Sequence, residues 1–175
     1  MGVDTFWRRI AEGAISGLGP RQLSGLVPVE LGAELAGRAA DPRLVLVQDC
    51  GALLGELLRL GAAGSRHAGT ARWLAAGPPD WDHRHLVGVW RPEFVRQAAE
   101  FLVTVPVEEW LDRFRDELPG RAPEPGPALP TPELMNRMAT GVRELRELFG
   151  AAARAGEAVL ERMVTADATR LAGLP

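Results

Sequence analysis

The sequence predicts a single, predominantly helical α+β domain that ends in a long C-terminal helix. Apolar residues recur at steps of three or four through residues 131–164, which is the spacing of one face of a helix. A shorter run, Leu44 to Val47, is apolar and half β-branched, as is typical of a strand. A chain of 175 residues can bury one sizeable core, so we expect residues 1–175 to form one domain.

The long helix is expected to begin at Thr131, whose hydroxyl can accept a free backbone N–H of the first turn. Pro132 suits the first helical position, and Glu133 suits the positive end of the helix dipole. Gly156 leaves two alternatives: it ends the helix and a strand follows, or it lies inside a helix that continues. We favour the continuing helix, because residues 157–163 are rich in good helix formers. The predicted apolar face consists of Leu134, Met138, Val142, Leu145, Phe149, Ala152, Val159 and Met163.

The remaining elements are predicted from shorter patterns. Residues 3–11 form either a short strand or the first turns of a helix, and Pro28 should split a broken helical pattern that follows residue 20. The segment from 119 to 132 is rich in proline, so we expect an extended, exposed loop. Further helices are expected at residues 50–61, 70–76, 91–105 and 106–118, and a further strand at 85–90.

Composition excludes several classes of protein. The net charge of -3 argues against general nucleic-acid binding, which depends on a basic face that neutralises phosphates. No apolar run approaches the ~18 residues of a membrane span, and the N-terminus lacks a signal-peptide core. The single cysteine, Cys50, excludes an internal disulfide and fits a reducing compartment. We therefore expect a cytoplasmic protein without nucleic-acid or membrane partners.

The best chemical cluster lies at residues 80–85. In an extended stretch, residues two apart share a face, so His83 and His85 could reach one metal ion, with a carboxylate from Asp80 or Asp82 nearby. Only one other histidine, His67, is present, and such short patterns are common on surface loops. A solvated loop is therefore the default interpretation, and we expect no bound cofactor.

Tryptophan is concentrated in the same irregular part of the chain. Trp73, Trp81 and Trp90 lie within it, and tryptophan is favoured at binding hot spots and in ligand pockets. Together with Asp82, His83 and His85, they are the candidate residues for binding a ligand or a partner. The alternative is that the three indoles only pin a long loop to the core.

Cys50 is a weaker candidate for chemistry. It follows Asp49 near the expected start of a helix, where the helix dipole lowers the pKa of a thiol and favours a nucleophile. No histidine lies near it in sequence to act as a base, and burial is the commoner fate of a cysteine. The chain also lacks a phosphate-binding glycine loop, a GxSxG motif, a paired-cysteine zinc motif and HExxH. The balance favours a protein that is not an enzyme.

Three stretches resemble the YfbM-like bacterial family, whose members carry a domain of unknown function. They are DCGALLGELLRLG at residues 49–61, HLVGVWRPEFVRQAAEFLVTVPVEEWLDRFRDEL at 85–118 and VRELRELFGAAARAGEAVL at 142–160. The resemblance implies a bacterial protein whose helices pack on a small sheet, and it implies no activity and no catalytic residues. Of the family's Asp-Lys and Trp-His pattern only Asp49 is present, and the Pro-rich loop replaces its Tyr-Pro and Trp step.

These observations favour a protein-binding or interaction module. One form of it is an immunity-type protein that neutralises a toxin by occlusion. The alternative is a small-ligand-binding protein or a metal-dependent enzyme that uses residues 67–90. A homodimer would be the natural way to bury the Met and Leu face of the last helix if one chain leaves that face uncovered.

Overall fold

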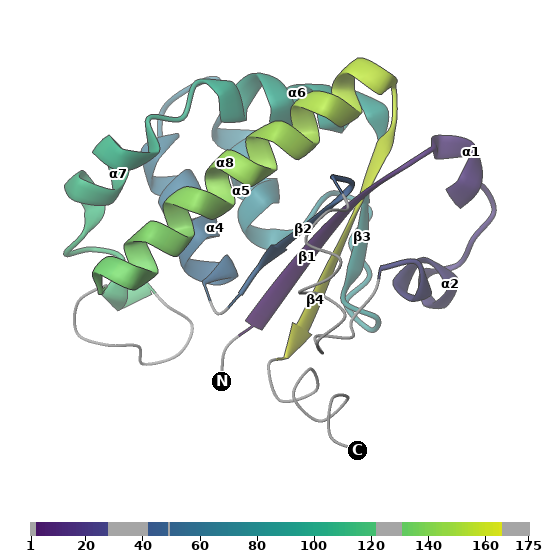
Figure 1. Ribbon diagram of the computed structural model, residues 1–175, viewed down its shortest axis with the longest axis horizontal. Helices are drawn as coiled ribbons and strands as arrows, with labels where there is room; N and C mark the ends of the chain where they lie inside the picture. Colours follow the sequence, from purple (N-terminus) through teal and green to yellow (C-terminus); the bar gives the residue numbers. More distant parts are fainter. Residues whose placement is uncertain (1–2, 28–41, 49, 122–130, 166–175) are drawn as a thin grey trace.

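The computed structural model describes residues 3–27, 42–48, 50–121 and 131–165 (Figure 1). Within these residues, antiparallel strands form one sheet in the order β2-β1-β4-β3. The strands are β1 (Val3–Ile10), β2 (Leu44–Val47), β3 (Val87–Trp90) and β4 (Ala158–Thr165). The predicted α+β class is confirmed, with helices packed on a small sheet.

One face of the sheet is covered by a layer of helices, of which α8 is the longest (Figure 1). This layer contains α4 (Gly51–Gly61), α5 (Ala68–Ala76), α6 (Pro92–Val103), α7 (Val107–Phe114) and α8 (Pro132–Ala155). The short helices α1 (Glu12–Ile15) and α2 (Pro20–Gly25) lie on the other face, and a 3-10 turn, η1, spans Pro119–Arg121.

Alternation along the strands divides the core into two parts, because successive side chains of a strand point to opposite faces. Trp7, Trp90 and Val159 pack with the helix layer. Phe6 and Leu160, each one residue away from a member of the first set, pack on the face of α1 and α2. Both faces of the central strands are therefore buried.

The favoured continuation of the last helix beyond Gly156 is wrong, and the alternative that a strand follows is correct. Gly156 adopts a left-handed conformation with φ 64° and ψ 28°, which costs glycine little. The next residues form β4, which pairs with β1 on one side and β3 on the other. Pairing on both edges and burial on both faces outweigh helix propensity, which contributes only ~0.7 kcal/mol per residue or less for these residue types.

The other predicted elements are found close to their expected positions. Residues 3–11 form a strand rather than a helical turn, and the expected strand at 85–90 is β3. The predicted split at Pro28 and most of the Pro-rich loop at 119–132 lie outside the described residues. In α8, Met138 and Leu145 are fully buried within the chain, so this face does not require a second copy to cover it.

Gly61 ends α4, as expected, but close packing is the reason that glycine is needed there. A Cβ atom built on Gly61 would lie 2.1 Å from the ring of Trp110 in α7. A Cβ atom built on Gly69, near the start of α5, would have no neighbouring atom within 4 Å. The contact between α4 and α7 therefore requires glycine at position 61, whereas position 69 has room for a side chain.

The substitution Gly61→Ala is expected to lower the free energy of unfolding by about 1–3 kcal/mol, because the added methyl group must displace the indole of Trp110. The matched substitution Gly69→Ala should be neutral or raise it by up to about 1 kcal/mol, since alanine favours a helix. Urea denaturation of both variants measures the difference. Equal stabilities would contradict the packing argument.

Candidate functional site

The candidate segment around Asp82 forms an exposed turn that leads into β3. One carboxylate oxygen of Asp82 accepts hydrogen bonds from the backbone N–H groups of Arg84, at 3.1 Å, and His85, at 2.7 Å. The same oxygen lies 2.9 Å from Nδ1 of His85. The backbone N–H of His85, followed by its ring, holds the pKa of Asp82 below its usual value. This carboxylate therefore closes the turn, which is a structural role.

The other groups proposed for metal binding do not gather around Asp82. His83 is exposed, Asp80 forms an ion pair with Arg91 at 3.0 Å, and the ring of His67 lies 5.5 Å from that of Phe101. Among the residues that the structure describes, no three His, Cys, Asp or Glu side chains are placed to hold one metal ion.

The three candidate tryptophans lie in different surroundings. Trp73 packs edge-on against Phe94, with ring centroids 5.1 Å apart. Trp81 covers Gly88, where an added Cβ atom would lie 2.7 Å from its ring. Trp90 is 0% exposed and belongs to the main core. These contacts anchor the irregular segment to the helices and the sheet.

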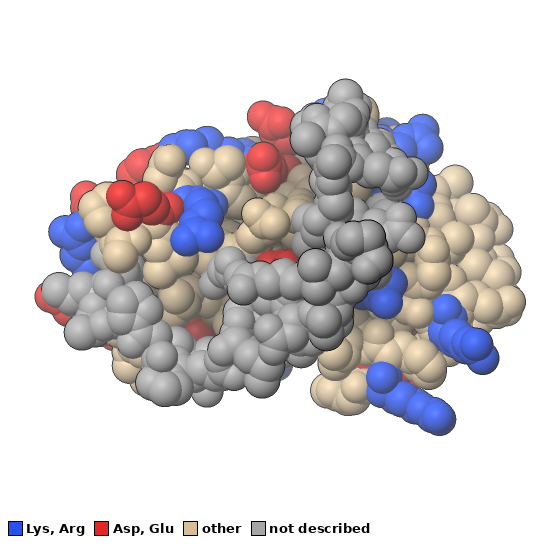
Figure 2. Space-filling model, turned by 60° about the horizontal axis from the view of Figure 1, so that its bottom comes forward, with Lys and Arg blue, Asp and Glu red and all other residues tan. Residues whose placement is uncertain are grey.

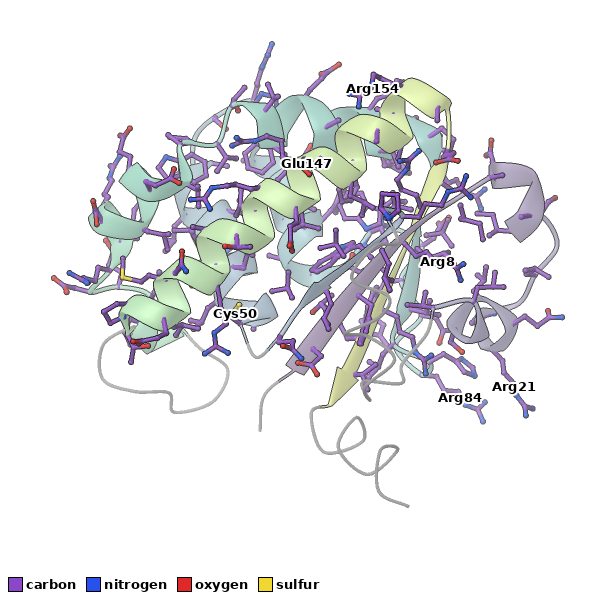
Figure 3. All side chains as sticks on the ribbon, in the orientation of Figure 1. Arg8, Arg21, Cys50, Arg84, Glu147 and Arg154 are labelled. Carbon is purple, nitrogen blue, oxygen red and sulfur yellow. The ribbon has the colours of Figure 1, made fainter. Side chains whose placement is uncertain are left out.

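Cys50 is buried, with 2% of its surface exposed, at the N-terminus of α4 (Figure 3). Its side chain does not cap the helix. Asp49, which precedes it, lies outside the described residues. The burial agrees with a structural cysteine.

A buried carboxyl group, Glu161, lies in the centre of β4 and is 0% exposed. Its cross-strand neighbours are Trp7 on β1 and Gly88 on β3. The indole Nε1 of Trp90 donates a hydrogen bond to Oε2 of Glu161 at 2.8 Å. Two other buried polar atoms, Oε1 of Glu161 and Nε1 of Trp7, have no hydrogen-bond partner among the described residues.

Burial raises the pKa of Glu161 to about 8, although the indole N–H groups of Trp90 and, more weakly, Trp7 oppose the increase. The group is therefore largely protonated at neutral pH and enclosed by indoles. Glu161 was not among the candidate residues, because it lies within residues 157–163, whose composition favours a helix. The available signal was a single carboxylate within the apolar run of residues 158–164.

An elongated furrow follows β2 on its side toward α8. One hollow of about 780 Å³ is lined by Leu44 and Val45, and a second of about 210 Å³ by Leu46 and Val47. Glu144 of α8 lines both hollows, so they meet at the middle of this helix. We call the two together the β2–α8 furrow.

The wall of the furrow on α8 extends over most of this helix. It consists of Asn136, Arg137, Thr140, Gly141, Glu144, Arg146, Glu147, Leu148, Gly150, Ala151 and Arg154. Gly141 lets the helix pack closely on Val47 of β2, since an added Cβ atom would lie 3.0 Å from that side chain, and two carboxylates occupy the middle of the wall. Figure 3 shows Glu147 in the middle of α8 and Arg154 near its C-terminal end. Partial burial, followed by repulsion from Glu147, raises the pKa of Glu144 above its usual value.

Charged side chains elsewhere on the helix layer form local pairs. Arg143 of α8 binds Glu108 of α7 at 2.7 Å, and Arg59 binds Glu56 within α4 at 2.7 Å. On the face seen in Figure 2, acidic and basic side chains are mixed over the helices. Among the described residues, Glu144 and Glu147 form no such pair, although Arg146 and Arg154 also line the larger hollow.

Comparison of the chain with protein-family models, with curated proteins and with solved structures found no match. None of the helices described here combines the length and apolar content that a transmembrane segment needs. Any inference about function therefore rests on the residues and their geometry.

The raised pKa of Glu161 predicts a stability that falls as pH rises. The pKa of Glu161 is about 8 in the folded protein and 4.5 in the unfolded chain. The free energy of unfolding therefore decreases as the pH rises from 4.5 to about 8. The full shift corresponds to a change on the order of 5 kcal/mol. Glu161→Gln should remove this decline, because its amide remains neutral and can still accept from Trp90.

Urea denaturation from pH 4.5 to 9 measures the effect on both proteins. Glu161→Gln should be closest to the wild type at the acidic end and more stable at the basic end. The exposed substitution Glu109→Gln is the control and should keep the wild-type slope. Parallel pH profiles for the wild type and Glu161→Gln would show that Glu161 does not titrate in this way.

Proposed function

We propose that this chain is a protein-binding module that recognises its partner along the β2–α8 furrow. The observation that carries the proposal is the combination of an edge strand with a long hollow and two adjacent carboxylates. Val103, which lines the larger hollow from α6, is 69% exposed, so the furrow also offers an apolar contact. Exposed apolar groups beside polar ones are typical of surfaces that bind other proteins.

An immunity-type protein, which neutralises a toxin by covering it, is one form of this function. The proposal includes a relationship to the YfbM-like bacterial family and a place in the bacterial cytoplasm. The three stretches that resemble the family lie in the helix layer and the two strands paired beside it. The contrasting proposal, a ligand or metal site at residues 67–90, has less support, since Asp82 closes a turn and Trp90 is buried.

Photo-crosslinking in the cells that produce the protein tests this function. A benzophenone amino acid placed at Thr140, which lines the furrow and is exposed, should crosslink to a partner protein. The same amino acid at Arg84 is the matched control, because Arg84 is exposed on the turn before β3, well away from α8 (Figure 3). Mass spectrometry of the adducts identifies the partner.

We expect one protein to be captured from Thr140 and not from Arg84. Capture of the same proteins from both positions would indicate nonspecific encounters and contradict the proposal. Failure of Thr140 to capture any protein would also contradict it, provided that the variant is folded by circular dichroism.

A further inference from the structure

The register between β1 and β2 shows which backbone groups of β2 face outward. The N–H of Arg9 on β1 donates to the carbonyl of Arg43 at 2.8 Å, and the Cα register pairs Arg8 with Leu44. In an antiparallel pair, residues alternate between those that bond to the partner strand and those that face away. The backbone groups of Leu44 and Leu46 therefore point away from β1.

Among the described residues, these groups form a short row of hydrogen-bonding sites without a partner strand. Each of the two leucines presents one N–H and one C=O, and no described residue bonds to them across this edge. Within the described sheet, β2 is an edge strand, and such an edge can pair with an extended segment of another chain. The two residues are about 7 Å apart, which is the repeat of one face of a strand.

The wall on α8 fits a strand that lies beside this edge. Alternate side chains of an added strand would face α8, where Thr140 and Ala151 are small enough to leave room. The furrow follows β2 from Leu44 to Val47, so the hollow has the same direction as the row of free groups. An extended segment can use the backbone row and the hollow together.

The charge of the furrow selects the kind of segment. Glu144 and Glu147 are exposed in its middle. Of the arginines that line the larger hollow, Arg9 is paired with Glu157 at 2.8 Å, and Arg154 lies at the far end of α8. Arg146 donates to the carbonyls at the end of α6, at 2.9 Å and 2.8 Å, and Arg143 is paired with α7. A cationic side chain entering the furrow would therefore meet two carboxylates and relieve their mutual repulsion.

We propose that the β2–α8 furrow binds an extended segment of a partner protein, which adds as an edge strand beside β2 and places a Lys or Arg side chain between Glu144 and Glu147. This inference rests on the proposed function and names the form of the partner. Backbone hydrogen bonds to Leu44 and Leu46 supply binding energy without sequence preference, and the two carboxylates supply selectivity.

The first test uses a phage-displayed library of random linear peptides of about 12 residues, long enough to span a strand of ordinary length. The full chain serves as bait. The enriched peptides should share a central Lys or Arg within a β-branched, alternating pattern. Failure to enrich peptides, or enrichment of a pattern without a cation, would overturn the proposal.

The second test measures the affinity of an enriched peptide by fluorescence anisotropy. The double substitution Glu144→Arg and Glu147→Arg should weaken binding at least about tenfold, because attraction becomes repulsion. The double substitution Glu93→Arg and Glu109→Arg, on α6 and α7, makes the same change of charge outside the furrow and should leave the affinity unchanged. Equal weakening by both variants would point to long-range charge alone and overturn the site.

The third test examines the strand pairing without changing the protein. Amide hydrogen exchange at Leu44 and Leu46 should slow at least about tenfold when the peptide binds. Val45 and Val47, whose N–H groups face β1, are internal controls and should change little. A peptide methylated on alternate backbone nitrogens should lose most of its affinity. Unchanged exchange at both leucines would overturn the strand-addition mode.

These outcomes separate the two proposals. Capture of a partner from Thr140 without slowed exchange at Leu44 and Leu46 would support a protein-binding surface and contradict the added strand. Failure of both experiments would contradict both proposals. Dimerisation of the chain through this edge, detected as doubled mass that the two arginine substitutions reverse, would assign the furrow to a second copy and overturn the inference.

Discussion

The pairing of β4 with β1 and β3 at once is the constraint on which the rest of this structure depends. β4 is aligned with β1 from Ala158 to Thr165, and its other edge pairs with all of β3. Gly156 makes this possible, because its left-handed conformation turns the chain from α8 directly into the sheet. The long helix and the central strand are thus consecutive in the chain and stacked in space.

The same strand brings a carboxyl group into the core. Glu161 faces the helix layer, where Trp90 donates its indole N–H to the acid and packs edge-on against Phe149 of α8, with ring centroids 5.3 Å apart. One residue of β3 therefore connects β4 to the long helix. A protonated acid fits this environment better than a charged one, because burial penalises charge far more than an uncharged polar group.

A central position for β4 leaves β2 at an edge of the described sheet. β2 is short, bonded to β1 on one side and flanked by α8, so its outward backbone groups and the helix wall border one furrow. The placement of the candidate surface therefore follows from the order of the strands. Of the residues most prominent in the sequence, Trp73 and Trp81 pack against the helices and the sheet, and His85 bonds to Asp82 within the turn.

Patterns within single elements predicted much of the fold. The N-cap at Thr131, the apolar stripe of α8 and the apolar run of β2 all depend on neighbours close in sequence, and all were found as expected. The strand after Gly156 was the less favoured of two alternatives, because its local composition favours a helix and the pairing that overrides this preference comes from β1 and β3. The furrow was not predicted either, since its two walls are about 90 residues apart in sequence.

By itself, the sequence determined the helical layer, the presence of strands and the absence of recognisable catalytic motifs, because these properties are encoded over a few neighbouring residues. Only the tertiary structure decided that Glu161 is a buried acid, that Asp82 closes a turn and that β2 lies at an edge beside α8. Each of these depends on which distant segments meet, and strand order and burial are set by long-range packing that no local pattern specifies.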